Sequence, residues 1–214
     1  YGAGREARST ADFLARRYPG LELFVTSDDG TAELEGTTSI PAGEAANVTR
    51  FGTIVKSPGV SLYKPVFDAA RQAGVKITSN LNIWAAHFRE GRTVAAISGT
   101  KGKSTTATLV HLMLVHSGVD AILAGNVGIP PLDAADKAQT VVLELSSYQT
   151  ADIGFAPDIA AISNLFPEHV DWHGGLDNYY RDKLNIFVKG PKLAALGPQA
   201  ASNERVLKAI LPAT

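Results

Sequence analysis

The clearest chemical pattern in the chain is a glycine-rich loop between an apolar run and a helical pattern. Residues 98–105 read Ser-Gly-Thr-Lys-Gly-Lys-Ser-Thr. Glycines let successive backbone N–H groups point at phosphate oxygens, so Lys103 would reach the β- and γ-phosphates of a nucleotide and Ser104 would ligate magnesium. The strict pattern has a further glycine where this chain has Ile97, so the loop is a shortened variant with Gly99 at the turn. A plain glycine turn is the alternative, but the strand-to-helix setting favours phosphate binding.

Two polar segments that follow other apolar runs could complete such a site. Glu144 ends a predicted strand, and a carboxylate at the carboxyl end of a strand near a phosphate loop is well placed to hold magnesium. An ion-paired strand end is the alternative. In segment 164–173, His169 could ligate a second divalent cation or orient an attacking group, although alone it reads as a surface-loop histidine. Other members of the segment stay with the surface-loop interpretation: Glu168, Asp171 and His173.

Composition limits the classes of function. The 214 residues are 45% hydrophobic and 19% charged, so the chain can bury a sizeable core. A formal net charge of -1 gives no reason to expect nucleic acid or an anionic membrane as a partner. The chain has no cysteine for a disulfide, a zinc–thiolate site or a thiol nucleophile. No apolar run is long enough to span a bilayer and no signal segment opens the chain, so we expect a cytoplasmic location without membrane insertion.

Apolar runs alternate with helical patterns along the chain. Before a polar break at 89–92, strands are predicted at 21–26, 53–56 and 75–78, and helices at 7–17 and 64–73. After it, strands are predicted at 93–97, 141–145, 159–163 and 193–196, and helices at 103–116, 176–188 and 203–211. This order predicts an α/β fold, with a Rossmann-like parallel-sheet domain over 1–91 and a P-loop α/β central domain over 92–214. From its spacing, Lys183 reads as a solvated helix lysine.

Five stretches together resemble the Mur ligase family, in family order and at family-like spacing. They are 98–105, Gly-Asn-Val-Gly at 125–128, Glu-Leu-Ser-Ser-Tyr-Gln at 144–149, Asn-Leu-Phe-Pro-Glu-His-Val-Asp at 164–171 and Tyr-Arg-Asp-Lys-Leu at 180–184. The resemblance covers nearly the whole chain, more weakly before residue 91. It implies an ATP-dependent amide ligase of peptidoglycan precursor synthesis, which adds glutamate to UDP-N-acetylmuramoyl-L-alanine. In that reaction ATP phosphorylates the substrate carboxylate and the amino group of glutamate attacks the acyl phosphate.

The resemblance also implies which residues hold ATP and metal. The ATP phosphates would lie against Gly99, Thr100, Lys101, Gly102, Lys103, Ser104 and Thr105. Two magnesium sites, which manganese could also fill, would use Ser104, Glu144, His169 and a carbamylated Lys183. Catalysis would depend on Lys103, Glu144, His169 and Lys183, because the metals and Lys103 offset charge on the transferring phosphoryl group.

A second set of residues would hold the uridine diphosphate substrate. Segment 2–9 resembles the family's uridine diphosphate turn, and 57–60 resembles its Ser-Pro-Gly loop beside the uracil. For segment 2–9, a turn that binds a nicotinamide cofactor is the alternative. Such a site expects an acidic residue after the second strand, but here Thr26-Ser27 come before the acidic pair Asp28-Asp29. For segment 57–60, a simple Pro-Gly turn is the alternative. The implied contacts are Gly4, Arg5, Glu6, Ala7, Thr26, Ser27, Ser57, Pro58 and Gly59, with Asn126, Ser147 and Gln149 at the muramoyl and peptide end.

Departures from the family pattern leave alternatives open. Stretch 79–84 lacks the usual acidic residues. Family members are much longer, so we expect the rest of the central domain and the glutamate-binding third domain to lie outside this chain, which alone would be inactive. D-Glutamate is the expected added amino acid; L-glutamate is the alternative, because Asp-Trp-His at 171–173 is unusual for D-glutamate enzymes.

Other functions fit the sequence less well. A non-catalytic module that holds the UDP-linked precursor is one alternative, which the retained site residues disfavour for the parent protein. A folylpolyglutamate synthase or a plain P-loop NTPase would leave the turn at 2–9 without a role. We expect a monomer whose partners are UDP-N-acetylmuramoyl-L-alanine, glutamate and ATP.

Overall fold

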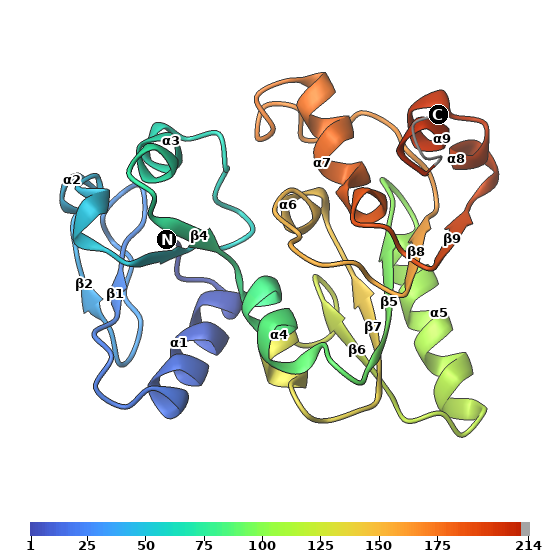
Figure 1. Ribbon diagram of the computed structural model, residues 1–214, viewed down its shortest axis with the longest axis horizontal. Coiled ribbons are helices and arrows are strands. Elements are labelled where there is room, and N and C mark those ends of the chain that lie inside the picture. Colours follow the sequence, from blue (N-terminus) through green and yellow to red (C-terminus); the bar gives the residue numbers. More distant parts are fainter. Residues whose placement is uncertain (211–214) are drawn as a thin grey trace. The chain divides into compact units, whose positions relative to one another are not determined.

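A computed structural model describes residues 1–210 of the chain. Two compact units divide it, Tyr1–Ile83 and Trp84–Thr214. The division falls inside helix α4 (Asn80–Phe88), before the predicted boundary at residue 91. Figure 1 shows the elements of each unit in chain order. The assignment of a separate ligand to each unit stays a prediction.

The first unit contains two short parallel strand pairs. β1 (Phe24–Val25) pairs with β2 (Thr38–Ser39), and β3 (Thr53–Val55) pairs with β4 (Lys76–Thr78). Its helical elements are α1 (Arg5–Arg17), α2 (Ala42–Ala45), the 3-10 turn η1 (Val48–Arg50) and α3 (Pro65–Gln72). Proline at the first position of α3 fits because its fixed φ suits a helix start and its missing N–H has no partner to lose there. The predicted parallel α/β arrangement is confirmed, with shorter strands than expected.

Stretch 79–84, which lacks the acidic residues of the family pattern, fastens α1. The Asn80 amide donates to the Glu6 carbonyl at 3.1 Å and to the hydroxyls of Ser9 and Thr10 at 3.2 and 3.1 Å. All three hydroxyl and amide side chains are buried. A buried amide without hydrogen-bond partners would cost free energy. These bonds satisfy the Asn80 amide, and they link the first turns of α1 to the first residue of α4.

The second unit contains a five-stranded parallel sheet with the strand order β6-β7-β5-β8-β9 (Figure 1). The strands are β5 (Thr93–Ser98), β6 (Ala121–Gly125), β7 (Thr140–Glu144), β8 (Ile159–Ile162) and β9 (Leu193–Leu196). Apart from their first residues, β5 and β7 are buried throughout, as expected for strands covered on both faces. Ile97 lies opposite Glu144 in the register, so the phosphate loop and Glu144 leave the sheet at the same edge.

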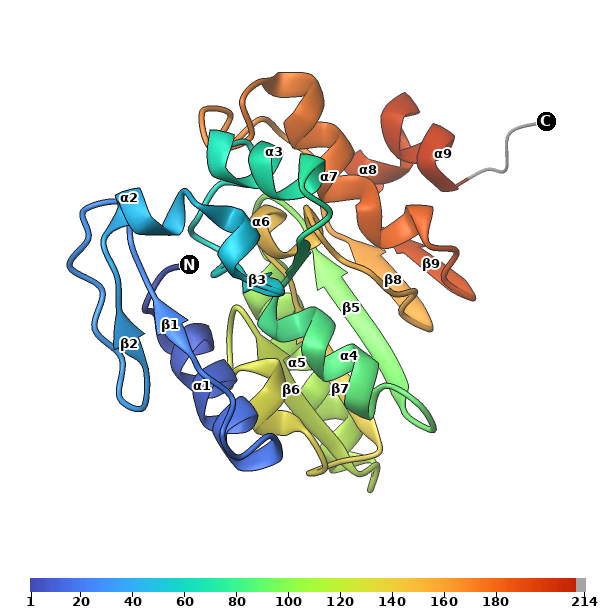
Figure 2. The same cartoon turned by 60° about the vertical axis from the view of Figure 1, so that its left-hand side comes forward.

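Helices of the second unit carry the polar segments to that edge. α5 (Lys103–His116) packs against β5, β6 and β7, and α7 (Leu176–Val188) packs against the short helix α6 (Ser147–Thr150). Figures 1 and 2 both show α6 beside α7. The remaining elements are the 3-10 turn η2 (Pro131–Ala134), α8 (Pro198–Ala201) and α9 (Glu204–Ile210). Of the predicted last helix, Leu211 lies outside the described residues.

Candidate functional site

The phosphate loop has the backbone that its sequence predicts. Gly99 has φ 149°, and a Cβ there would lie 2.0 Å from Ser163 Oγ. Gly102, at φ 78°, is the N-cap of α5, so Lys103, Ser104 and Thr105 form the first turn of that helix. The N-terminus of a helix presents unpaired N–H groups and a partial positive charge, both suited to a phosphate.

Residues directly after β8 form hydrogen bonds with this loop. Asn164 accepts from the Thr100 and Lys101 N–H groups, through its carbonyl at 3.1 Å and its Oδ1 at 2.9 Å. The Asn164 amide and the Ser163 hydroxyl both donate to the Lys101 carbonyl, at 3.0 and 2.7 Å. The loop is therefore held in shape by the neighbouring strand end.

A buried hydroxyl pair joins the loop to α7. The Thr100 and Tyr179 hydroxyl oxygens lie 3.0 Å apart, and the Tyr179 hydroxyl donates to the Phe166 carbonyl at 2.6 Å. Tyr179 is fully buried, and burial raises the pKa of its hydroxyl to about 12. Spacing gave no signal for this residue, because only the fold brings helix 176–188 to the loop.

Glu144 is a fully buried carboxylate at the end of β7. Its Oε2 accepts from the Asn126 amide at 3.0 Å, whereas its Oε1 is buried and has no hydrogen-bond partner among residues 1–210. Burial raises the pKa of Glu144, and the Asn126 bond and the charges of Lys103 and Lys183 oppose that rise. A buried oxygen without a partner fits a carboxylate that receives a cation.

Lys183 is buried, which corrects its interpretation as a solvated helix lysine. It is 2% exposed on the inner face of α7, with Nζ 5.5 Å from the centre of the Tyr179 ring. Burial, followed by the charge of Lys103, lowers the pKa of Lys183 to about 8. The spacing could not reveal this, because Asp182 beside it suggested a surface position.

His169 is exposed, unlike Glu144 and Lys183. Its side chain is 52% exposed, its ring centre is 5.2 Å from that of Tyr148, and its Nε2 lies 3.8 Å from Glu168. Glu168 pairs with Lys101 of the phosphate loop at 2.7 Å, and this bond holds the pKa of Glu168 below its usual range. His169 has a positive φ of 54°, uncommon for a non-glycine residue.

His173 is fully buried, which corrects its interpretation as a surface-loop residue. Its Nδ1 lies 2.7 Å from Asp182 Oδ2 and its Nε2 lies 3.0 Å from Ser147 Oγ. Gln149, also buried, completes a capping box with Ser146 at the start of α6. The predicted peptide-end residues Ser147 and Gln149 are therefore held by bonds within this unit.

No cluster of three or more His, Asp or Glu side chains that could hold a metal ion occurs within the described part of the chain. A metal here would thus need oxygen ligands besides the Asp and Glu side chains. The Ser104 hydroxyl, phosphate oxygens and a carbamylated Lys183 would supply such ligands beside Glu144.

Predicted uridine-site residues of the first unit are brought together. The Gly2 N–H donates to the Thr26 carbonyl at 2.8 Å, and the Ser57 N–H donates to the Tyr1 carbonyl at 2.9 Å. A Cβ on Gly2, which has φ 92°, would lie 2.8 Å from Ser57 Oγ, so the two loops touch. Exposed Gly4 and Arg5 then begin α1.

Comparison with known proteins identifies the family. The family model for the Mur ligase middle domain matches residues 97–199. A UDP-N-acetylmuramoyl-L-alanine--L-glutamate ligase of Micromonospora sp. is 38% identical over 202 residues, which cover 90% of this chain and 44% of the relative. One from Xylella fastidiosa (strain Temecula1) is 36% identical over 234 residues, covering 99% of this chain and 48% of the relative. This chain belongs to the Mur ligase family.

A solved ligase structure shares the fold. The UDP-N-acetylmuramate:L-alanyl-gamma-D-glutamyl-meso-diaminopimelate ligase from Neisseria meningitides aligns with a TM-score of 0.54 at 15% identity, covering 97% of this chain and 72% of that one. This Mur ligase chain spans about half the length of the curated relatives named above. No helix within residues 1–210 is long and apolar enough to cross a membrane.

Proposed function

We propose that this chain is the UDP-precursor-binding and phosphate-binding part of an ATP-dependent ligase that joins L-glutamate to UDP-N-acetylmuramoyl-L-alanine. The names of the relatives support L-glutamate and replace the expectation of D-glutamate. The observation that carries the proposal is the buried charge cluster behind the phosphate loop, in which Glu144 and Lys183 lose their hydration. Desolvated charges at the carboxyl edge of a parallel sheet are typical of a reactive site.

Residues of the second unit would bind the ATP phosphates and magnesium. Backbone N–H groups of the loop and Lys103 hold the ATP phosphates, and Ser104 with Glu144 holds magnesium. Magnesium, when bound, neutralises charge on the phosphoryl group that moves to the substrate carboxylate. Thr100 is held by hydrogen bonds to Asn164 and Tyr179, and these bonds fix the shape of the loop. A fixed loop would hold the γ-phosphate of ATP in a constant position relative to the substrate carboxylate.

Lys183 would act as a carbamate rather than as an ammonium ion. Its pKa of about 8 leaves roughly a tenth of the side chain as neutral amine at pH 7, the form that attacks carbon dioxide and releases a proton as the carbamate forms. Carbamylation converts a buried cation next to Lys103 into a carboxylate, which relieves the repulsion between the two lysines. His169, exposed beside Glu168, would contact a second metal only when ligands fill the site.

The enantiomer of glutamate is tested by assaying the longest gene product that contains this chain. Purified protein is given UDP-N-acetylmuramoyl-L-alanine, Mg-ATP and either L- or D-glutamate, and the nucleotide product is identified by mass spectrometry. We expect product with L-glutamate and none with D-glutamate. Lys103→Ala is the matched inactive control. Product with D-glutamate alone would contradict the proposal.

A further inference from the structure

The loop after β6 is fastened to the residue that ends β7. Gly125, the last residue of β6, pairs with Glu144 in the sheet register. The Asn126 N–H donates to the Glu144 carbonyl at 2.8 Å, and the Gly125 N–H donates to the Ile129 carbonyl at 2.9 Å. Gly125 has φ 108°, and a Cβ there would lie 2.3 Å from the Glu144 carbonyl oxygen, so this close approach requires glycine. The backbone of Asn126 is therefore fixed relative to Glu144.

The side chain of Asn126 holds one oxygen of the Glu144 carboxylate. Its Nδ2 donates to Oε2 at 3.0 Å, and the Val127 backbone N–H also bonds to the carboxylate. An ionised carboxylate only accepts hydrogen bonds, so the nitrogen of the Asn126 amide faces it. Oε1 is buried and has no hydrogen-bond partner among residues 1–210. The two oxygens of Glu144 are therefore not equivalent, because one is bonded to the loop and the other is left for a ligand.

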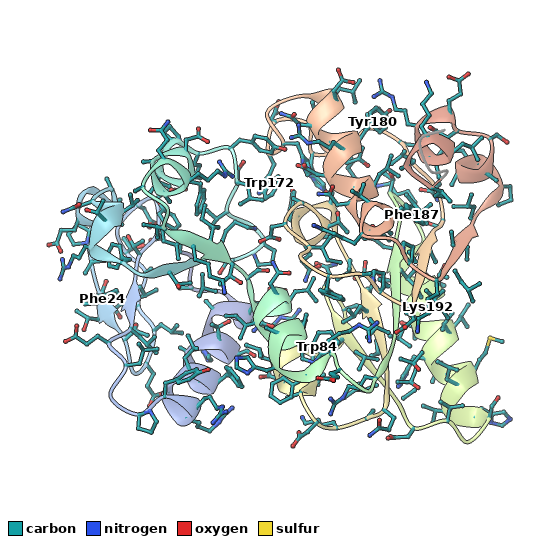
Figure 3. The ribbon with its side chains drawn as sticks, viewed as in Figure 1. Phe24, Trp84, Trp172, Tyr180, Phe187 and Lys192 are labelled. Atoms are coloured by element: carbon teal, nitrogen blue, oxygen red, sulfur yellow. The ribbon has the colours of Figure 1, made fainter. Side chains whose placement is uncertain are left out.

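A glutamate carboxylate needs such a partner to keep one orientation. Its terminal torsion is broad, so an unsupported carboxylate turns easily about the bond that carries it. The charges of Lys103 and Lys183 both act on Glu144, and a carboxylate free to turn could pair with either cation. In Figure 3, the labelled Tyr180 and Phe187 lie on α7, the helix that carries Lys183 between them. The bond from Asn126 opposes such a turn, since the turn would break it.

We propose that Asn126 is a positioning residue for the magnesium carboxylate: its amide holds Oε2 of Glu144 and thereby keeps Oε1 available to a divalent cation. This inference rests on the proposed function, in which Ser104 and Glu144 hold magnesium. It gives Asn126 a role besides the expected contact with the muramoyl substrate. Hydrogen-bonded partners of metal-binding side chains typically contribute roughly ten- to a hundredfold to metal affinity.

The test separates metal binding from phosphate binding. Calorimetric titration gives the affinity of the chain for ATP in magnesium and in EDTA, and the ratio of the two affinities reports the contribution of the metal. We expect Asn126→Leu, which removes the donor and keeps the approximate size of the side chain, to lower this ratio about tenfold. The affinity in EDTA should stay unchanged, because no phosphate ligand is lost. Equal weakening in magnesium and in EDTA would show a general structural effect and would overturn the inference.

A double-mutant cycle shows whether Asn126 acts through Glu144. The carboxylate is absent from Glu144→Gln, so Asn126→Leu in that background should change the ratio by less than about twofold. Equal losses in both backgrounds would overturn the inference. Asn47→Leu is the matched control, because Asn47 is an exposed asparagine of the first unit, and its ratio should equal that of the natural protein.

The remaining outcomes distinguish the inference from the proposed function. An unchanged ratio in Asn126→Leu would overturn the inference and leave the proposed function standing. A natural protein that binds ATP equally well in magnesium and in EDTA would overturn the magnesium site and the inference together. Asn126 is exposed, so its replacement opens no core, and circular dichroism checks the fold of each variant. Should Asn126→Leu fail to fold, Asn126→Ala removes the same donor and is carried through the same cycle.

Discussion

The Thr100 and Tyr179 hydroxyl oxygens lie 3.0 Å apart in the core of the second unit, and together they tie the phosphate loop to the helix that carries Lys183. Tyr179 also donates to the Phe166 carbonyl, which Thr100 contacts at 2.9 Å. Neither bond reaches a ligand. Their effect is to make the shape of the loop depend on the position of α7.

Removal of the Tyr179 hydroxyl should weaken the fold and the loop together. Tyr179→Phe removes a buried hydroxyl that bonds to both the Phe166 carbonyl and the Thr100 hydroxyl, so we expect the free energy of unfolding to fall by about 1–2 kcal/mol. Denaturant titration measures this, and Mg-ATP binding should weaken as well. Tyr180→Phe, on the same helix and half-buried, is the control. Equal stability of the two variants would contradict the role given to the hydroxyl.

Glu144 should make stability depend on pH in the acid range. Burial raises its pKa, so the folded protein holds this proton more tightly than the unfolded chain does. The stability from Glu144 is then full at low pH and is lost as pH rises from the ordinary glutamate value through the raised one. At pH 7 without metal, Glu144→Gln should raise the free energy of unfolding by about 1 kcal/mol and should abolish stabilisation by magnesium and ATP. A variant still stabilised by magnesium and ATP would argue against the metal role.

Lys183 should give the opposite dependence in the alkaline range. Its pKa is lowered from 10.5 to about 8, so between these values the unfolded chain binds the proton that the folded protein has released. The free energy of unfolding should therefore rise with pH across this window, by on the order of 2 kcal/mol. Lys183→Met should remove the rise, as denaturant titrations at pH 7 and 10 would show. The same rise in the variant would mean that another group causes it.

Gly99 should tolerate no side chain. A Cβ would lie 2.0 Å from Ser163 Oγ at a φ of 149°, so we expect Gly99→Ala to cost at least about 2 kcal/mol of stability and to weaken nucleotide binding. Gly43→Ala is the control, because Gly43 is in helix α2 and has nothing within 4 Å of its Cβ position. Similar melting temperatures for both variants would show that the loop adapts.

Local patterns predicted the bounds of several elements correctly. Helices 103–116 and 176–188 and strand 193–196 have the predicted bounds, since apolar periodicity and flanking glycines are local signals. Strand 121–125 and helix α4 were not predicted, although both are regular. Residues 80–88 mix buried polar and apolar side chains, so neither period stands out.

The site was predicted in composition more than in arrangement. The phosphate loop and Glu144 follow strands, so parallel pairing alone brings them to one edge. Lys183 and His173 were misplaced on the surface, because their burial depends on how α7 packs against α6, a contact between distant segments. Tyr179 and Asn164 support the loop by the same kind of contact, which no spacing encodes.

Calorimetric titration of this chain with UDP-N-acetylmuramoyl-L-alanine tests the central claim most directly, with UDP, NAD and Mg-ATP as parallel ligands. The account predicts that the muramoyl ligand binds at least about tenfold more tightly than UDP, that Mg-ATP binds and that NAD does not. Binding of Mg-ATP without any uridine ligand would contradict the account, and would leave only a phosphate-binding loop on a parallel sheet.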